Sequence, residues 1–472
     1  MKRIVTLMLA AMLVLGSVAG ASAADIKVKG QWDFSFEWLD NPDFQGEDND
    51  GPNEDTFGAK QRLRTQIDII ASENLRGVVF FEMGDTVWGR NDGALGADGK
   101  SVEVKRSYID WTVPNTDLLV RMGIQGLALP GAVAGSPVLD DDVAALTLTY
   151  KFSDMVGLTA FWARPYDSYS GEPAGGHNNN AFDELDLFGL VLPVTLDGAK
   201  ITPWGMYGVL GKDVARGDGN GASWNQAAYG LRPANYSGTT QTFGDDSTAW
   251  WGGAAFELTM FSPLSFKLDA MYGSVDGDEI GNIDMDRAGW LVIGAIDYKM
   301  DMMTPGIFAW YASGDDDDEN NGSERMPYVV PDFGPTSFGF DKVGAPIATD
   351  SLASVSGTGM WGVGVQLANI SFVENLKHTL RVVYMEGTND KDMADHASVR
   401  PVDSNGAAWN GLYLTEKDSL WEVNFDHFYK IYENLDLIVE MGYIKADLDE
   451  DTWHDQDFDD AWKLGFNLKY SF

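Results

Sequence analysis

Apolar and polar residues alternate strictly at both ends of the chain, once its first two dozen residues are set aside. From Ile26 to Trp38, every second residue is apolar or Gly, and the residues between them are Lys, Gln, Asp, Ser or Glu. From Trp462 to Phe472, Trp, Leu, Phe and Tyr alternate with Lys, Gly, Asn and Ser. A period of two is typical of β-strands with one apolar and one polar face. The pattern predicts a strand at each end.

Short reversals and long loops alternate along the rest of the chain. The tripeptide Glu-Asn-Leu occurs at three of the reversals. Eight short turns are predicted, at Glu73–Leu75, Pro114–Asp117, Ser153–Val156, Leu196–Ala199, Ser262–Leu264, Asp301–Pro305, Glu374–Leu376 and Glu433–Leu435. Nine long, Gly- and Asp-rich loops are predicted at 40–56, 89–100, 126–142, 165–181, 211–247, 274–286, 314–356, 387–417 and 447–457. This organisation predicts about 18 strands, or 16 if one weaker reversal lies within a loop.

The alternating stripes predict a barrel in a membrane. An apolar stripe with aromatic residues near its ends suits a face that crosses hydrocarbon, and a barrel closes by pairing its first and last strands. After the first residues, no apolar run approaches the roughly 18 to 20 residues of a transmembrane helix. We therefore expect residues 24–472 to form one all-β domain, a transmembrane antiparallel β-barrel with short periplasmic turns, long extracellular loops and a water-filled lumen.

The first 23 residues predict export. Lys2 and Arg3 precede an apolar run from Ile4 to Val14, and Ala21-Ser22-Ala23 has the small-x-small pattern that signal peptidase cleaves. Residues 1–23 are thus a predicted signal peptide, and the predicted location is the bacterial outer membrane. The alternative is an uncleaved membrane anchor, for which the apolar run is short.

Composition narrows the possible functions. The chain has 472 residues, with 33 Lys and Arg against 72 Asp and Glu, a formal net charge of −39, and no Cys. Such a surface excludes a nucleic-acid binder held by phosphate contacts, and the lack of Cys excludes disulfides and thiolate chemistry. The acidic run Asp315–Glu319 lies in the longest loop. Its carboxylates are either simply solvated or bind divalent cations that bridge lipopolysaccharide.

Arginines gather at polar positions of the second to fifth strands and indicate a pore constriction. Strand parity turns them toward the lumen. The next loop, 126–142, is unusually apolar, rich in Gly and Pro, and closed by three aspartates. We expect this loop to fold into the barrel, with its carboxylates opposite the arginines, so that a transverse field filters solutes by size and charge. The candidate constriction residues are Arg62, Arg64, Arg76, Arg106, Arg121, Asp140, Asp141 and Asp142.

Motifs for catalysis or metal binding mostly fail. The segment 276–287 begins like an EF-hand loop, but Ile280 and Arg287 stand where oxygen ligands are required. His177, His378, His396, His427 and His454 have no spacing suited to zinc. There is no G-x-S-x-G, Walker A or H-E-x-x-H motif. We expect no enzyme activity, no metal and no cofactor, apart from loosely held divalent cations at the acidic loops.

The whole mature chain resembles general outer-membrane porins, most closely the homotrimeric porin family of sulfate-reducing bacteria. The resemblance rests on the strand Ile26–Trp38, on Val104–Trp111 leading through a short turn to Val120–Gln125, and on the terminal aromatic residues Tyr470 and Phe472. It implies passive diffusion of small hydrophilic solutes and ions, a homotrimer in lipid and lipopolysaccharide, and recognition of Tyr470 and Phe472 by the barrel-assembly machinery. Small or polar residues in the outward stripe, such as Gly30 and Thr65, fit a trimer contact.

Two other functions remain open. The first is a substrate-specific channel of the sugar type, in which aromatic residues form a stacking track. The candidate tryptophans are Trp88, Trp162, Trp204, Trp250, Trp251 and Trp310. The second is a secreted carbohydrate-active enzyme with two catalytic carboxylates. The terminal Phe472 and the contrast between short turns and long loops argue against the enzyme.

Overall fold

The computed structural model of the chain describes residues 24–42, 44, 56–90, 93–96, 102–167, 184–212, 214, 230–233, 243–318, 320–341, 356–395, 413–453 and 458–472. The predicted signal peptide, residues 1–23, lies outside them. Within these residues, none of the helical segments has the length and apolar character needed to span a membrane.

Strands make up almost all of the regular structure. They are β1 (Asp25–Asp40), β2 (Thr56–Ser72), β3 (Leu75–Val87), β4 (Glu103–Thr112), β5 (Leu118–Ala128), β6 (Gly135–Ser136), β7 (Asp140–Lys151), β8 (Gly157–Asp167), β9 (Glu184–Val191), β10 (Val194–Leu196), β11 (Ala199–Leu210), β12 (Ser247–Leu258), β13 (Leu264–Asp276), β14 (Arg287–Tyr298), β15 (Thr304–Ala312), β16 (Asp332–Phe333), β17 (Met360–Val373), β18 (Leu376–Gly387), β19 (Ser419–Tyr432), β20 (Leu435–Asp447) and β21 (Ala461–Ser471). A short 3-10 helix, η2, spans Lys391–Asp395.

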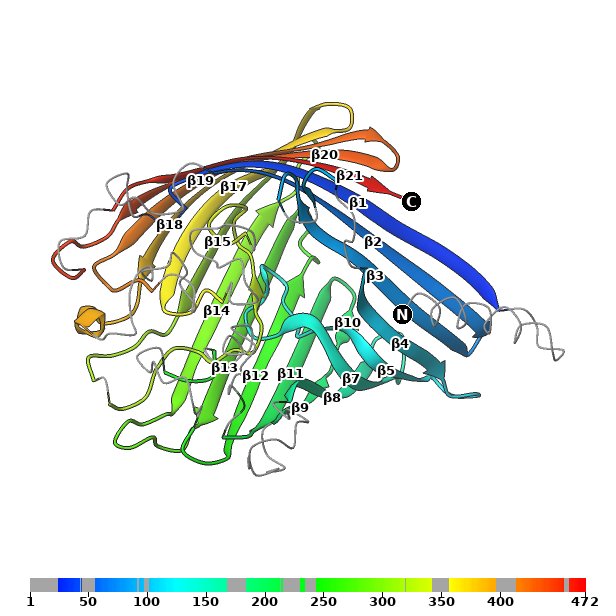
Figure 1. Cartoon of the computed structure of the whole chain (residues 1–472), viewed down its shortest axis with the longest axis horizontal. Coiled ribbons are helices and arrows are strands. Elements are labelled where there is room, and N and C mark those ends of the chain that lie inside the picture. The colour runs from blue at the N-terminus through cyan, green and yellow to red at the C-terminus, as the bar shows by residue number, and fades with distance from the viewer. Residues whose placement is uncertain are drawn as a thin grey trace.

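The strands form one closed antiparallel barrel. Each wall strand pairs with the next wall strand along the chain, and β1 closes the barrel against β21, from Gln31 opposite Ser471 to Asp40 opposite Trp462. In Figure 1, the blue strand β1 therefore lies beside the red strand β21. Segments β9 and β10 both pair with β11 and form one crossing. The barrel thus has 18 strands, which confirms the predicted fold class and the larger of the two strand counts.

All eight predicted short turns connect adjacent strands at one end of the barrel. Local chemistry explains this success. Asn115 and Asn375 adopt positive φ angles of 61° and 63°, a conformation that Asn tolerates better than most residues. The strand ends that the long connections join lie at the other end. We call the two ends the turn end and the loop end.

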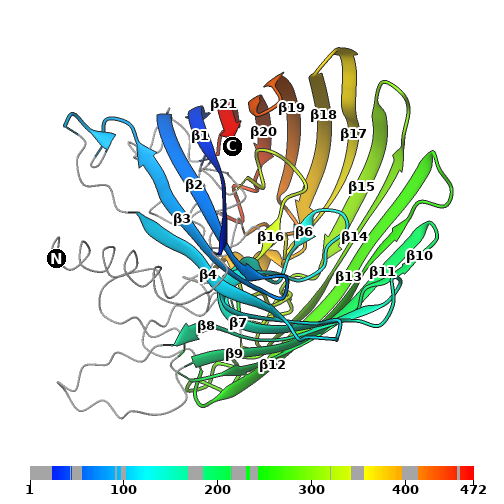
Figure 2. The ribbon, with the colours of Figure 1, turned by 90° about the vertical axis from the view of Figure 1, so that its right-hand side faces the viewer.

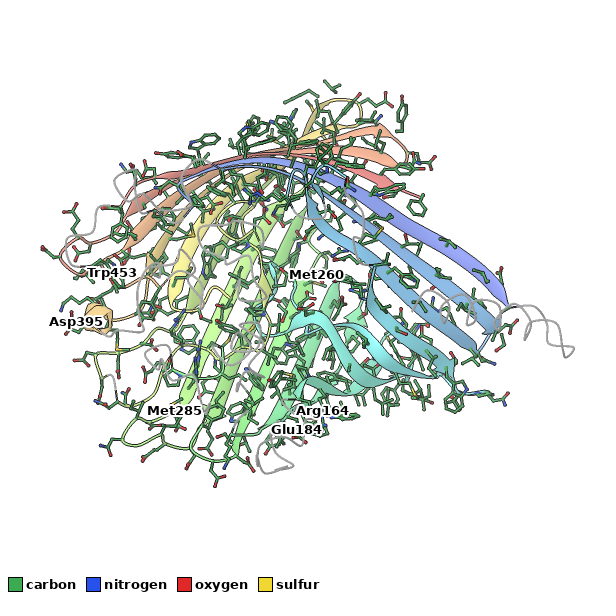
Figure 3. All side chains as sticks on the ribbon, viewed as in Figure 1. Arg164, Glu184, Met260, Met285, Asp395 and Trp453 are labelled. Atoms are coloured by element: carbon green, nitrogen blue, oxygen red, sulfur yellow. The ribbon has the colours of Figure 1, made fainter. Side chains whose placement is uncertain are left out.

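The two faces of the wall have opposite character. Apolar side chains at alternate positions are exposed on the outside, for example Ile26 and Val28 on β1 and Trp421 on β19. The residues between them turn inward, and several carboxylates there are buried, including Asp33 and Asp68. Figure 3 shows side chains projecting from both faces of the ribbon. An apolar outside and a polar inside are what a barrel surrounded by lipid requires.

Two loops fold into the barrel. Residues 129–139, between β5 and β7, contain β6, and the long loop between β15 and β17 contains β16. These two short strands pair with each other, and Leu139 forms a bridge with Val330. Figure 2 places β6 and β16 inside the ring of wall strands. The sequence indicated an inward fold only for the first loop, so the prediction that 314–356 is a wholly external loop is wrong.

An apolar core forms where these loops meet the wall. Leu129, Val138 and Leu139 from the first loop, with Phe333 and Phe340 from the second, are buried among inward side chains. The wall residues in this core include Phe161, Leu187, Trp204, Met206, Trp251, Leu291, Phe308 and Trp310. These strands carry apolar residues on both faces, because their inward faces are covered by loops. The lumen is therefore filled on this side and polar on the side of β1 to β5.

Candidate functional site

The predicted arginines lie close together on neighbouring strands. Arg62 and Arg64 belong to β2, Arg76 to β3, Arg106 to β4 and Arg121 to β5. We call these five residues the arginine wall. Arg76, Arg64 and Arg121 face inward, because they alternate with the exposed apolar residues of their strands.

Four of the five arginines of the wall are paired with a carboxylate on an adjacent strand, and Arg106 on β4 pairs with Asp142 on β7. Arg64 donates to Glu82 at 2.5 Å. Asp110 accepts from both Arg76, at 2.5 Å, and Arg121, at 2.6 Å. Arg62 lies 3.9 Å from Asp33 and 3.7 Å from Asp85.

The arginines lie nearer the open lumen than their partners do. The side chains of Arg62 and Arg121 are 30% and 28% exposed, whereas those of Asp33 and Asp110 are 8% and 10% exposed. The guanidinium groups thus cover the carboxylates. A solute in the lumen meets cationic groups first, with a layer of anions behind them.

The three predicted aspartates do not lie opposite the arginine wall. Asp140, Asp141 and Asp142 begin β7 instead of closing the loop. Asp142 pairs with Arg106, and also with Lys105 at 2.8 Å, so it belongs to the same side of the barrel as the arginines. The prediction that these aspartates face the arginine wall and create a transverse field with it is therefore wrong. The cause is strand register, which places Asp142 beside Gly126 at the end of β5.

The loop 129–139 crosses the lumen and is tied to the far wall. Asp269 on β13 is 1% exposed and accepts hydrogen bonds from the backbone N–H groups of Ala132 and Val133. The N···O distances are 2.8 and 2.9 Å for Ala132 and 2.9 Å for Val133. Hydrogen bonds to an ionised acceptor are stronger than neutral ones. Asp269 therefore holds this loop across the lumen.

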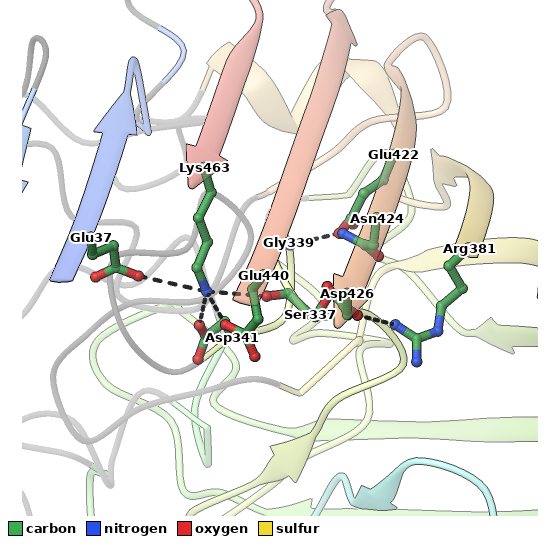
Figure 4. Close-up of polar contacts among 10 residues, drawn as sticks. All are labelled: Glu37, Ser337, Gly339, Asp341, Arg381, Glu422, Asn424, Asp426, Glu440 and Lys463. Atoms are coloured by element: carbon green, nitrogen blue, oxygen red, sulfur yellow. Dashed lines mark hydrogen bonds and ion pairs between the residues drawn. The ribbon is translucent and has the colours of Figure 1, made fainter. Parts of the chain in front are cut away.

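The second inward loop is tied to a third part of the wall, β19 to β21 (Figure 4). Its anchor is Lys463 on β21, whose side chain is 2% exposed. Its Nζ atom pairs with Asp341 of the loop, with Glu440 on β20 at 2.9 Å and with Glu37 on β1 at 3.6 Å. It also donates to the backbone carbonyl of Ser337 at 3.2 Å. One buried cation thus joins the loop to three wall strands.

Two acidic residues of β19 complete this attachment. Glu422 is fully buried and accepts from the Gly339 N–H at 3.0 Å and from the Thr336 hydroxyl at 2.9 Å. Asp426 accepts from the Ser337 hydroxyl at 2.8 Å. We call the segment 336–341, with its five wall partners Lys463, Glu37, Glu440, Glu422 and Asp426, the loop latch.

A polar cavity of about 240 Å³ lies between the arginine wall and the loop latch. Its lining contains both signs of charge. Arg62 and Lys60 contribute cations. The anions are Asp33, Glu37, Asp85, Asp341 and Glu440. The remaining lining residues are Ser35, Phe36, Gln61, Ile438, Gly465, Phe466 and Asn467.

Near the loop end of the barrel, a network of buried side chains holds the second inward loop. Asp315 accepts from the Tyr413 hydroxyl at 2.9 Å and from the Ser323 hydroxyl. The Arg325 guanidinium lies 5.0 Å from the centre of the Tyr413 ring. Burial raises the pKa of the Tyr413 phenol well above its usual value, so Tyr413 stays a neutral donor. Asp315 is thus a structural residue and not a solvated member of the acidic run.

The six candidate tryptophans do not form a stacking track in the lumen. Trp88, Trp162 and Trp250 are 45%, 41% and 49% exposed and lie on the outside of the wall. Trp204, Trp251 and Trp310 turn inward but are buried beneath the loops. Neither group offers a free ring face to a sugar in the lumen.

The sequence did not single out the residues that hold the loops. Asp269, Glu422, Glu440 and Lys463 each act through partners that are distant in the chain. A signal for the second loop was nevertheless present, because Val329, Val330, Phe333, Phe338 and Phe340 make 329–340 too apolar for a solvated loop. At the acidic loops, no group of three or more His, Asp or Glu in the described ranges is placed to hold a metal ion. Loosely bound divalent cations there stay a prediction.

The fold and the loop-narrowed lumen define a class of structure, a closed 18-stranded antiparallel β-barrel with loops folded into its lumen. No protein-family model and no curated protein matches the chain. Several solved structures match the chain in fold. OpdL of Pseudomonas aeruginosa is 13% identical with a TM-score of 0.52, covering 95% of this chain and 99% of its own. OccK1 (OpdK) of the same organism is 9% identical with a TM-score of 0.53, covering 95% and 98%. OccAB3 of Acinetobacter baumannii is 11% identical with a TM-score of 0.52, covering 94% and 99%. At these identities the likeness concerns the fold, and the resemblance to porins of sulfate-reducing bacteria stays a prediction.

Replacing Arg62, Arg64 and Arg121 together by Ser is expected to shift ion preference toward cations. The substitution uncovers Asp33 and Glu82, which the guanidinium groups now cover and neutralise, and leaves Asp110 with Arg76 as its remaining partner. We expect the cation/anion permeability ratio to rise by roughly threefold or more. The measurement is the reversal potential across a planar bilayer in a salt gradient.

A matched control is Arg164→Ser. Arg164 is also an arginine of the wall strands and pairs with Asp186 at 2.6 Å and Glu184 at 3.4 Å, but on the outside of β8 and β9 (labelled in Figure 3). This control should leave the reversal potential unchanged. An unchanged reversal potential in the triple variant would show that the arginine wall does not set selectivity.

Proposed function

We propose that this protein is an outer-membrane channel that admits small charged hydrophilic solutes selectively, by passive diffusion. The observation that carries the proposal is that two loops cross the lumen and are fixed to different parts of the wall. Beside the second loop lies a polar cavity of about 240 Å³, lined by two cations, Arg62 and Lys60, and by carboxylates of the wall and of that loop. A channel for unselective diffusion has no need of such a narrow, charge-lined passage.

The selectivity follows from hydration. A solute that enters a narrow passage loses part of its hydration shell, and the lining must replace those interactions. Arg62 and Lys60 can replace water around an anionic group, while Glu37, Asp341 and Glu440 can do so around a cationic group. A neutral solute of the same size gains less from these side chains, so it passes more slowly.

The solved neighbours favour the selective channel over the general porin that the sequence predicted first. One of them, OpdK of P. aeruginosa, was crystallised with vanillate, a small aromatic carboxylate. A lumen lined by arginine side chains suits a solute of that charge. The sugar-type version has weaker support, because the candidate tryptophans are outside the barrel or buried.

Location and assembly belong to the same proposal. The predicted signal peptide and the apolar outer face support a place in the outer membrane, among lipid and lipopolysaccharide. Phe472 ends the chain on the outside, 45% exposed, with its backbone paired to Gly30 and its ring 6.1 Å from that of Trp32. This position suits recognition by the barrel-assembly machinery. Gly30 and Thr65 are opposed in the outward stripe, and such small or polar outward residues support a homotrimer contact.

Liposome swelling tests the selective channel. Purified protein is reconstituted, and swelling rates are compared for neutral, anionic and zwitterionic solutes of equal size. We expect a charged solute to enter several times faster than its neutral counterpart. Equal rates for solutes of equal size would favour the general porin, and a lack of swelling with any solute would contradict both channels.

A further inference from the structure

Two histidines that are 49 positions apart in the sequence meet on the outer face of the barrel. His378 on β18 and His427 on β19 are direct cross-strand partners. Their Nδ1 atoms lie 2.6 Å apart, with ring centroids 4.8 Å apart and ring planes at 86°. The spacing of the histidines in the sequence gave no indication of a metal site, because strand register alone brings them together.

Strand parity places the pair on the outside. His427 alternates with Trp421, Val423, Phe425 and Tyr429, which are 50%, 38%, 39% and 40% exposed. Both imidazoles are half-exposed, and the ring of Phe425 lies 4.4 Å from that of His427. His378 follows the turn at Asn375 by three residues, about 10 Å along the strand. The pair therefore lies near the turn end, beside aromatic residues of the kind that mark a membrane interface.

Ionisable residues on the apolar outside of a barrel are costly unless they have a function or a partner. The shared hydrogen bond satisfies one nitrogen of each ring. Within the part of the chain that the structure describes, no further hydrogen bond to either imidazole is present. The flanking cross-strand neighbours, Ile370 and Val439, are apolar. The remaining nitrogen of each ring thus has no protein group to pair with.

We propose that His378 and His427 form a site for a divalent transition-metal ion, with copper(II) bound most tightly. Two imidazole nitrogens bound to one metal at about 2.0–2.1 Å, with an angle of 90–110° between them, lie roughly 2.9–3.4 Å apart. The observed 2.6 Å reaches that separation by a small rotation of the two rings, whose terminal torsions are soft. Metal affinity for nitrogen ligands rises to copper(II) along the divalent series.

The site would be open. Two protein ligands leave the other coordination positions to water, which can reach the pair from the nearby turn end. A metal ion there would bridge β18 and β19 on the outside of the barrel and would not touch the lumen. The proposal is therefore independent of the proposed channel selectivity.

Copper(II) titration of the detergent-purified full-length mature protein, followed by electron paramagnetic resonance, tests the site. We expect one copper ion per chain with the signal of two imidazole nitrogens. The variants H378F and H427F place an apolar side chain on the outer face and should each weaken binding roughly tenfold or more. Heat-modifiable gel migration checks that these variants remain folded.

The matched control replaces the other three histidines, His177, His396 and His454, by Ala. This triple variant should keep the full two-nitrogen signal. The proposal is overturned if the double variant H378F/H427F keeps that signal, if the triple variant loses it, or if folded wild-type protein shows no two-nitrogen copper at all. In the last case the two histidines form only a hydrogen-bonded pair.

Discussion

Replacing Lys463 by Met is expected to release the segment 336–341 from the barrel wall. The substitution leaves Glu37, Asp341 and Glu440 close together without the buried cation that joins them. Breaking a buried ion pair by removing one partner typically destabilises a protein by about 3–5 kcal/mol. The expected results are a lower temperature for the heat-modifiable shift on gels and a larger, noisier single-channel conductance, because a freed loop no longer narrows the lumen.

Lys469→Met is the matched control. Lys469 lies on the same strand, six residues further along and on the same face as Lys463, and has no contact with the loop latch. It should change neither the temperature nor the noise. Lys463→Arg keeps the charge and should restore most of the stability. Wild-type conductance and stability in Lys463→Met would show that the loop latch does not depend on its cation.

The loop 129–139 is expected to lose its fixed position when Asp269 is replaced by Ala. The backbone N–H groups of Ala132 and Val133 then have no acceptor, and each unsatisfied buried group costs about 1–3 kcal/mol. We expect larger conductance steps with frequent fluctuations, since the other contacts of this loop among the described residues are mainly apolar packing and backbone hydrogen bonds to 329–334 of the second inward loop. Single-channel recording in planar bilayers measures both effects.

Two further variants sharpen this experiment. Asp269→Asn keeps one acceptor oxygen and should give an intermediate result. Asp297→Ala removes an inward carboxylate of β14 that contacts Gln366 and not the loop, so it should behave like wild type. If Asp269→Ala and Asp297→Ala gave the same conductance as wild type, the carboxylate of Asp269 would not be what holds the loop.

Local features of the sequence were enough to predict the barrel. Turn residues such as Asn115 and Asn375 act within a few positions, and the alternation in β1 and β21 fixes which face meets lipid. The same parity identified Arg62, Arg64 and Arg121 as neighbours. Strand number, turn positions and the inward faces of these strands thus follow from short-range chemistry.

Contacts between distant segments were beyond the reach of the same patterns. Asp142 was assigned to the wrong side because the end of the loop was placed three residues too late. In the sequence, Lys463 and Glu422 do not differ from other inward polar residues. Only the structure shows that the second inward loop contacts them. The pairing of His378 with His427 likewise depends on the register of β18 and β19.

Single-channel recording of detergent-purified, folded protein in a planar bilayer tests the central claim, an aqueous path through the barrel between the arginine wall and the two inward loops. We expect discrete, stepwise conductance that rises with salt concentration and changes in the Lys463→Met and Asp269→Ala variants. Folded protein that inserts into the bilayer without any conductance steps would contradict the existence of that path.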